Sequence, residues 1–561
     1  MRLPTLRRRP IAALAAALGL LVAGAAHAGT CENLTVLNVG LSSGTVTGSV
    51  TVPGPNYTAA NGVTYTNVPS FCKVSVVLTP TTDSFINVEL WLPVSTWNGR
   101  FQGIGNGGYA GTIQQGLGTM ITGLQQGFAV ATTDMGTAPS TTTDADALIG
   151  HPQKWIDWGS RATHLMTVAS KQLIQTYYSA PPTYSYFTGC STGGQQGHMS
   201  AQRYPADYDG ILVGDAANNR THDHTAALWG YQWAHKTPLA LFFSTGQTGA
   251  MAAASAKQCA VKSGGVAGDP FLTDPRACDW EPASMQCTGA PDGICLTADQ
   301  VATARAKYQG PRNPVTGKQI FPGLPYGSEP PTTGGWANLD TQLETPFGSL
   351  FKWVFGPTFT YLSFNFDTDM QTLDSVLAPI LNANSTDLSA FKGRGGKILA
   401  YHGWSDPLAS PQDGINYYER LVATQGGGTS SATKAVQSYY RLFMVPGMYH
   451  CSGGPGPNAF GQPYGTSTTI PRPLSPDAGH DVFRALQQWV EKGVAPQRVV
   501  ATKYTNDDDT QPVLMTRPLC VYPNVARYKG TGDTNNEANF VCAPTLGRTD
   551  PAQVPAPEYI N

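Results

Sequence analysis

Alternating apolar and polar residues mark the N-terminal part of this chain. Between positions 45 and 52, Thr and Ser residues alternate with Val46, Val50 and Val52. Residues 74–78 are similarly rich in β-branched side chains. A period of two places the apolar side chains on one face of a strand, so both segments are predicted to be antiparallel strands.

Farther along, short apolar runs alternate with stretches of helical spacing. Strands are predicted at 101–105, 127–131, 184–187, 211–214, 397–403 and 439–445. Helices are predicted at 155–178, where apolar residues recur at helical intervals, and at 481–492. This alternation is typical of a parallel α/β sheet.

The alternation stops between residues 221 and 394. This stretch holds four cysteines, irregular Pro- and Gly-rich segments and many Trp and Phe residues. The simplest arrangement is one sheet domain formed by residues 29–220 and 395–561, with a separate domain, residues 221–394, inserted between its halves.

Composition narrows the possible partners. Charged residues make up 13% of the 561 positions, and the net charge is −2. The usual charged share is about 25%. Since there is also no basic stripe, we expect no nucleic-acid partner.

The first 28 residues have the organisation of an export signal. Arginines at 7–9 precede an apolar run at 11–25 and a small-x-small site, Ala26-His27-Ala28. A membrane anchor is the rival interpretation, but the apolar run is short for a span. We expect a signal peptide at 1–28, a secreted or periplasmic mature chain, and no membrane association after cleavage.

Ten cysteines follow the signal. They are Cys31, Cys72, Cys190, Cys259, Cys278, Cys287, Cys295, Cys451, Cys520 and Cys542. An even number in an exported chain predicts disulfides, although sequence alone does not fix their pairing. Metal binding is the rival interpretation, but no Cys-x-x-Cys pair is present, which disfavours a structural zinc site.

The pentapeptide 189–193 has the form Gly-x-Ser-x-Gly, with Ser191 at its centre. It follows the strand predicted at 184–187 and precedes a segment that can begin a helix. A strand, a glycine-flanked Ser and a helix describe a nucleophile elbow, which exposes the Ser hydroxyl at the edge of a sheet. An ordinary turn Ser is the alternative.

A Ser nucleophile needs a base and an acid that orients the base. Asp406 follows the strand at 397–403, and His450 follows the strand at 439–445. The order Ser, Asp, His is that of α/β-hydrolases, and all three residues lie at carboxyl ends of strands. Asp406 could instead cap a helix that starts at Pro407, and His450 could be a hydrogen-bonded loop residue. His402 is a rival base, but it precedes the acid and ends a strand, so a packed or hydrogen-bonded role suits it better.

Two cysteines adjoin the predicted catalytic residues. Cys190 directly precedes Ser191, and Cys451 directly follows His450. A disulfide between them would bring the two loops together, because its Cα atoms must lie within about 7 Å. The alternative is that both thiols are free and buried.

These motifs together resemble the tannase and feruloyl esterase family. Cys190-Ser191, Asp406 and His450-Cys451 match its CS-D-HC pattern. Residues 202–205, 209–211, 446–448, 529–530 and 540–542 extend the resemblance over nearly all of the mature chain.

The resemblance implies an α/β-hydrolase core with a large inserted lid, residues 221–394. It implies that the chain hydrolyses a small aromatic ester, such as a feruloyl or galloyl ester; one branch of the family hydrolyses the terephthalate monoester. It also implies five disulfides, which would be Cys190–Cys451, Cys31–Cys72, Cys259–Cys278, Cys287–Cys295 and Cys520–Cys542.

The lid departs from the family at one place. Relatives usually carry an acidic calcium loop after a lid cysteine, whereas here the residues after Cys259 leave only Asp269 as a carboxylate. Calcium takes six to eight oxygen ligands, commonly including more than one carboxylate. We therefore expect no calcium ion here and no other cofactor. His222 and His224 alone do not indicate another metal.

The oxyanion of an ester intermediate needs fixed N–H donors. Thr192, the residue after the nucleophile, supplies one candidate N–H, and the turn at Gly107 and Gly108 supplies the other; the sequence does not choose between the two glycines. The same three catalytic residues would also suit a serine peptidase, and a lid cleft would suit a non-catalytic binding protein. Ester against amide turnover separates the first two, and intact Ser, Asp and His residues argue against the third.

Overall fold

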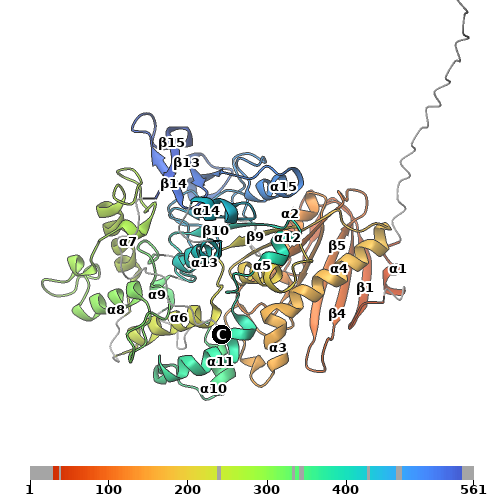
Figure 1. The fold of residues 1–561 in the computed structure, drawn as a ribbon, viewed down its shortest axis with the longest axis horizontal. Coiled ribbons are helices and arrows are strands. Elements are labelled where there is room, and N and C mark those ends of the chain that lie inside the picture. The colour runs from red at the N-terminus through yellow and green to blue at the C-terminus, as the bar shows by residue number, and fades with distance from the viewer. Residues whose placement is uncertain are drawn as a thin grey trace, which may run out of the picture.

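A nine-stranded mixed sheet forms the centre of the molecule in this computed structural model (Figure 1). The structure describes residues 30–36, 40–236, 242–330, 335–339, 347–425, 430–462 and 470–545. The signal peptide predicted at 1–28 lies outside these residues. In spatial order the strands are β1 (Gly44–Val52), β4 (Phe71–Leu78), β5 (Ile86–Pro93), β7 (Ala129–Thr133), β6 (Arg100–Ile104), β8 (Tyr184–Cys190), β9 (Gly210–Gly214), β10 (Lys397–Gly403) and β11 (Tyr440–Val445).

Strand direction divides this sheet into two parts. β1, β4 and β5 pair antiparallel, and β5 pairs antiparallel with β7. The strands from β7 to β11 are parallel to one another. The predicted alternating segments form β1 and β4, and the predicted apolar runs form the parallel strands, whereas β5 was not predicted. The carboxyl ends of the parallel strands therefore share one edge of the sheet.

Helices cover both faces of the sheet. Neighbouring residues of one strand, such as Ile211 and Leu212 of β9, belong to different apolar clusters, because successive side chains point to opposite faces. The Ile211 cluster includes helices α4 (Ala162–Tyr178) and α13 (Pro411–Thr424). The Leu212 cluster includes α2 (Leu117–Gln125) and α15 (Val482–Lys492).

Several predicted elements have different boundaries in the structure, and two of them have an identifiable cause. The helix predicted at 155–178 consists of α3 (Pro152–Ile156), a π-helical turn (Asp157–Arg161) and α4. In this turn the indole Nε1 of Trp158 donates to Gly108 O at 3.1 Å. The spacing of apolar residues in the sequence does not indicate such a contact with a distant loop. Strand β7 starts two residues later than predicted because Gly127, with φ of 84°, ends the turn after α2.

The described residues between β9 and β10 contribute no strand to the large sheet. Their helices are α6 (Arg220–Ala234), α7 (Thr245–Cys259), α8 (Ala298–Gln309), α9 (Trp336–Leu339), α10 (Ser349–Phe355), α11 (Thr368–Leu381) and α12 (Ser389–Gly393). Figure 1 shows α7, α8 and α9 on the side of the molecule opposite β1 and β4. The domain boundaries at 220 and 394 remain a prediction.

The C-terminal region adds two hairpins that the sequence patterns did not indicate. β12 (Arg498–Tyr504) pairs with β13 (Val513–Cys520), and β14 (Asn524–Tyr528) pairs with β15 (Phe540–Pro544). Shorter elements are α1 (Asn33–Val36), β2 (Tyr57–Thr58), β3 (Thr64–Tyr65) and α14 (Ser430–Gln437).

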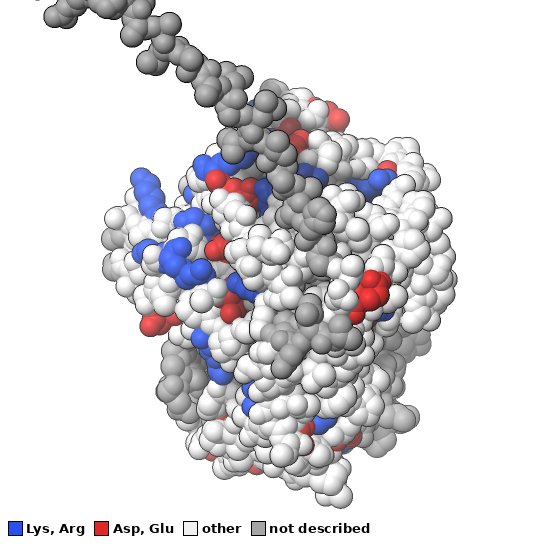
Figure 2. Space-filling view, turned by 90° about the vertical axis from the view of Figure 1, so that its right-hand side faces the viewer, with Lys and Arg blue, Asp and Glu red and all other residues white. Residues whose placement is uncertain are grey.

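Charged side chains are sparse on the face seen in Figure 2, where Lys and Arg side chains lie among Asp and Glu side chains. Among the described residues, no helix combines the length and apolarity that a membrane span requires.

Candidate active site

Ser191 lies between β8 and helix α5 (Thr192–Arg203), with φ of 62° and ψ of −122°. Non-glycine residues rarely adopt positive φ, and such strain concentrates at functional sites. The Ser191 N–H donates to Gly214 O of β9 at 3.0 Å, which fixes the turn against the sheet. The structure therefore contains the strained strand–turn–helix geometry that the pentapeptide predicts.

The elbow is closely packed, which explains its glycines. A Cβ atom on Gly189 would lie 2.6 Å from Gly193 O, and one on Gly194 would lie 2.4 Å from Gly214 O. Both distances are too short for real Cβ contacts. Small residues at these positions let α5 start directly beside β8 and β9.

Asp406 and His450 meet in the loops after β10 and β11. Nδ1 of His450 lies 2.7 Å from Oδ2 of Asp406. Oδ1 of Asp406 accepts hydrogen bonds from the N–H groups of Leu408 at 2.7 Å and Ala409 at 3.1 Å. These bonds fix the carboxylate, and the carboxylate in turn fixes the imidazole ring.

The electrostatics of the pair favour a charged acid beside a basic imidazole. Burial opposes ionisation of Asp406, but attraction to His450 and hydrogen bonds from His402 and His450 outweigh it and lower its pKa to about 2. Burial alone would lower the pKa of His450, but the neighbouring Asp406 carboxylate raises it above its ordinary value.

The structure contains the five predicted disulfides. They are Cys31–Cys72, Cys190–Cys451, Cys259–Cys278, Cys287–Cys295 and Cys520–Cys542, and no described cysteine is free. The Cα atoms of Cys190 and Cys451 lie 6.0 Å apart. This bond connects the residue before Ser191 to the residue after His450.

Asp215 is a further buried acid at this edge, and the sequence interpretation did not include it. Its Oδ1 accepts the Gly403 N–H at 2.7 Å, and its Oδ2 accepts the Cys451 N–H. It thereby holds the end of β10 and the residue after His450. The sequence feature that could have identified it is its position directly after the apolar run that forms β9, in Gly214-Asp215.

His402, the rival base, has a hydrogen-bonded structural position. Its Nε2 donates to Ala409 O at 3.0 Å and lies 3.4 Å from Oδ2 of Asp406. Burial would lower its pKa, but Asp215 and Asp406 raise that pKa to about 9. A histidine that stays protonated at neutral pH stabilises the two acids and is a poor general base.

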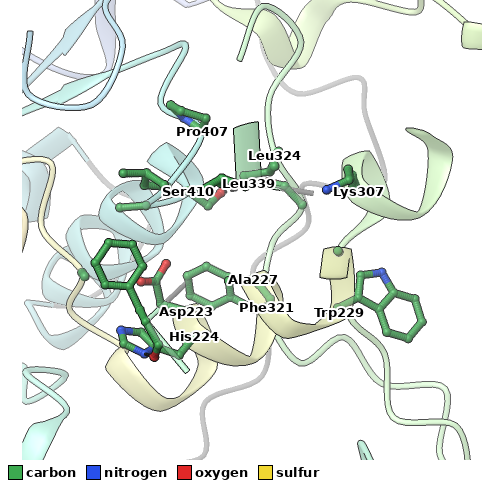
Figure 3. A pocket seen from close by; sticks show the side chains of 18 of the residues that line it. Asp223, His224, Ala227, Trp229, Lys307, Phe321, Leu324, Leu339, Pro407 and Ser410 are labelled. Atoms are coloured by element: carbon green, nitrogen blue, oxygen red, sulfur yellow. Dashed lines mark hydrogen bonds between the residues drawn. The ribbon is translucent and has the colours of Figure 1, made fainter. Parts of the chain in front are cut away.

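Ser191 and His450 line one cavity between the sheet edge and the lid. Figure 3 shows part of its wall, with Asp223 and His224 from α6 and Lys307 from α8. Most lining residues are apolar, including Ala227, Trp229, Phe321, Leu324, Trp336, Leu339 and Phe347. The arrangement places a hydroxyl and an imidazole at the wall of an aromatic-lined space.

The turn after β6 provides candidate N–H donors near Ser191. The Gly107 N–H already donates to Oε1 of Gln115 at 2.8 Å. Gly108 lines the cavity, and its N–H has no acceptor within the described part of the chain. Gly108 also holds the elbow, because its carbonyl accepts the Thr192 hydroxyl at 2.9 Å. The structure thus favours Gly108 over Gly107 as a donor to a bound ligand.

The loop after Cys259 does not fit calcium. Asp269 Oδ1 lies 2.9 Å from Nη2 of Arg517, and its Oδ2 accepts the Val266 N–H at 3.0 Å. Its carboxylate is therefore paired with an arginine. The lid histidines are also engaged elsewhere: His222 with Asp374 and Ile320 O, and His224 with Phe347 O.

Comparisons with known proteins show the family of this chain. The sequence profile of tannase and feruloyl esterase matches residues 72–543. The chain belongs to the tannase and feruloyl esterase family. An uncharacterised esterase of Xanthomonas campestris is 37% identical over 97% of this chain and 96% of its own length. Feruloyl esterase B of Aspergillus niger is 30% identical over 88% of this chain and 93% of its own length.

A solved structure shows the same fold. The crystal structure of feruloyl esterase B from Aspergillus oryzae superposes with a TM-score of 0.79 at 27% identity, over 91% of this chain and 99% of that one. The fold of this family member is therefore an α/β-hydrolase fold, as the sequence predicts, and the chain is a carboxylic ester hydrolase.

Proposed function

We propose that this family member is an exported serine esterase that hydrolyses esters of aromatic, phenolic acids through an acyl-enzyme. The observation that carries the proposal is the meeting of three elements at one cavity: the Ser191 elbow, the His450–Asp406 hydrogen bond and aromatic walls. Export is supported by the signal pattern at 1–28 and by the five disulfides, which persist in oxidising compartments.

In this mechanism His450 removes the proton of the Ser191 hydroxyl as its oxygen attacks the ester carbonyl. Asp406 holds the imidazole through Nδ1 and stabilises the imidazolium that forms. The imidazolium then gives its proton to the departing alcohol. Water, activated by the same imidazole, releases the acid and regenerates Ser191.

The negative charge on the carbonyl oxygen needs preorganised donors. We assign these to the N–H groups of Thr192 and Gly108. Thr192 begins α5, where N–H groups have no partner inside the helix and the dipole favours negative charge. We do not assign this role to the Gly107 N–H, because it already donates to Oε1 of Gln115.

A substrate screen tests the function. The purified mature protein is incubated with methyl ferulate, methyl gallate, mono(2-hydroxyethyl) terephthalate and the amide of ferulic acid. We expect turnover of the phenolic esters and none of the amide. Preferential hydrolysis of the terephthalate monoester would place the enzyme in the branch of the family that acts on that substrate. Turnover of the amide would indicate a peptidase. Binding without turnover of any ester would contradict the proposal.

A further inference from the structure

A buried carboxyl group stands on the wall of the cavity. Asp223, on α6, is 9% exposed, and its Oδ1 has no hydrogen-bond partner. Buried polar groups are almost always paired, because an unpaired one loses its hydration without replacement. The unfilled oxygen therefore points to a partner that arrives with the ligand.

The residues around Asp223 do not provide that partner. Phe321 and Ala227 line the same cavity as Asp223, and all three are labelled in Figure 3. Arg220, one turn earlier on α6, is the nearest cation along the helix. Its Nη2 donates to the Thr192 hydroxyl at 2.9 Å, and no ion pair joins it to Asp223 among the described residues.

Arg220 also places Asp223 relative to the reacting atoms. Arg220 contacts Thr192, which directly follows Ser191 in the sequence. The guanidinium of Arg220 also lies 5.1 Å from the Trp158 ring centroid. Asp223 follows Arg220 by three residues, so the two lie about 4.5 Å apart along the axis of α6. This spacing is comparable to the width of an aromatic ring.

We propose that Asp223 is a specificity-determining residue that accepts a hydrogen bond from a hydroxyl group on the aromatic ring of the acyl part of the substrate. The inference rests on the proposed function and narrows it to acyl groups with a ring hydroxyl. In this arrangement the apolar residues that line the cavity contact the aromatic ring of the substrate, and the Asp223 carboxyl accepts a hydrogen bond from the ring hydroxyl.

A hydroxyl fits this place better than a carboxylate does. Burial raises the pKa of Asp223 to about 7, against the attraction of Arg220, so the group exists in both protonation states near neutral pH. Either state accepts a hydrogen bond from a hydroxyl, whereas the ionised state repels a carboxylate. A ring without a hydroxyl leaves the carboxyl unpaired, and sites of this kind discriminate strongly against the analogue that lacks the donor.

Matched substrates and variants test the inference. Methyl 4-hydroxycinnamate and methyl cinnamate differ only in the ring hydroxyl. We expect the wild-type enzyme to prefer the first in kcat/KM by about tenfold or more, since hydrogen bonds to charged groups are of that strength. In Asp223→Leu the ratio should fall toward one, because kcat/KM falls more for methyl 4-hydroxycinnamate than for methyl cinnamate. In Asp223→Asn, which keeps an acceptor oxygen, most of the preference should remain.

The control variant is Asp374→Asn. Asp374 is a buried lid acid that pairs with His222 and does not line the cavity. It should lower stability without changing the substrate ratio. An unchanged ratio in Asp223→Leu, or an equal fall for both substrates, would overturn the inference. If the wild-type enzyme hydrolysed neither ester, the proposed function itself would have failed, so the two failures are distinguishable.

Discussion

Nδ1 of His450 lies 2.7 Å from Oδ2 of Asp406, across a sequence separation of 44 residues. This bond uses one ring nitrogen and leaves Nε2 for the cavity that His450 shares with Ser191. The imidazole is therefore oriented before substrate arrives.

Replacing Ser191 with Ala removes the proposed nucleophile and keeps a small side chain at the turn. We expect Ser191→Ala to lower kcat by several orders of magnitude with an unchanged circular dichroism spectrum and melting temperature. A serine-directed phosphonate should label the wild-type protein at Ser191. Labelling at a different residue, or near-normal turnover of the variant, would contradict the assignment.

The pH dependence follows from the pKa of His450. Its imidazole must be neutral to accept the Ser191 proton, and Asp406 raises its pKa above the ordinary value. We expect kcat/KM to fall as the pH decreases, with an apparent pKa above about 6.5. Asp406→Asn should shift the acidic limb of the pH profile to lower pH, because the negative charge that raises the pKa of His450 is gone, and it should also lower kcat. An acidic limb at the same pH in the variant would argue against an interaction between Asp406 and His450.

The disulfide beside the triad should support turnover. Cys190 and Cys451 connect the elbow to the His450 loop, and small misplacements of reacting groups are costly. We expect the double variant Cys190→Ala/Cys451→Ala to lose kcat for a phenolic ester, most clearly after correction for any unfolded fraction. Removing Cys287–Cys295, which closes a sequence separation of 8 within the lid, is the matched control and should leave kcat near the wild-type value. Equal kcat in the two double variants would exclude a positioning role.

Much of this site was predictable from sequence because its signals are local. The glycines around Ser191, the cysteines beside Ser191 and His450, and acids or bases directly after apolar runs all lie within a few residues of what they indicate. Asp215 carries the same local signal, an acid directly after a strand, and was overlooked, whereas Asp223 lies within a helix, where a single acid has no distinguishing pattern. What each carboxyl faces depends on residues far away in sequence: Phe321 lines the cavity together with Asp223, and the Cys451 N–H donates to Asp215.

The choice between Gly107 and Gly108 shows the same limit. It depends on the side chain of Gln115, whose Oε1 takes the Gly107 N–H. Sequence spacing cannot show which of two adjacent amides a glutamine reaches. The π-helical turn at Asp157–Arg161 escaped prediction for a related reason, since the apolar period continues through it.

A buried ion pair stands at the lid position where calcium would be expected from the family resemblance. Asp269 and Arg517 are each about 5% exposed or less in their side chains, and Arg517 also lies 4.3 Å from the Phe540 ring centroid. The pair joins the lid loop to the C-terminal hairpins. We expect a chelator to leave the melting temperature and kcat unchanged, because only an ion bound to the folded state would stabilise it by mass action.

The same position predicts how substitutions behave. Arg517→Met should lower the melting temperature, since it leaves the Asp269 carboxylate buried without its partner. The paired variant Asp269→Asn/Arg517→Met should recover part of that loss, and added calcium should rescue neither protein. A melting temperature that drops with chelator and returns with calcium would show that the loop binds the ion despite its single carboxylate.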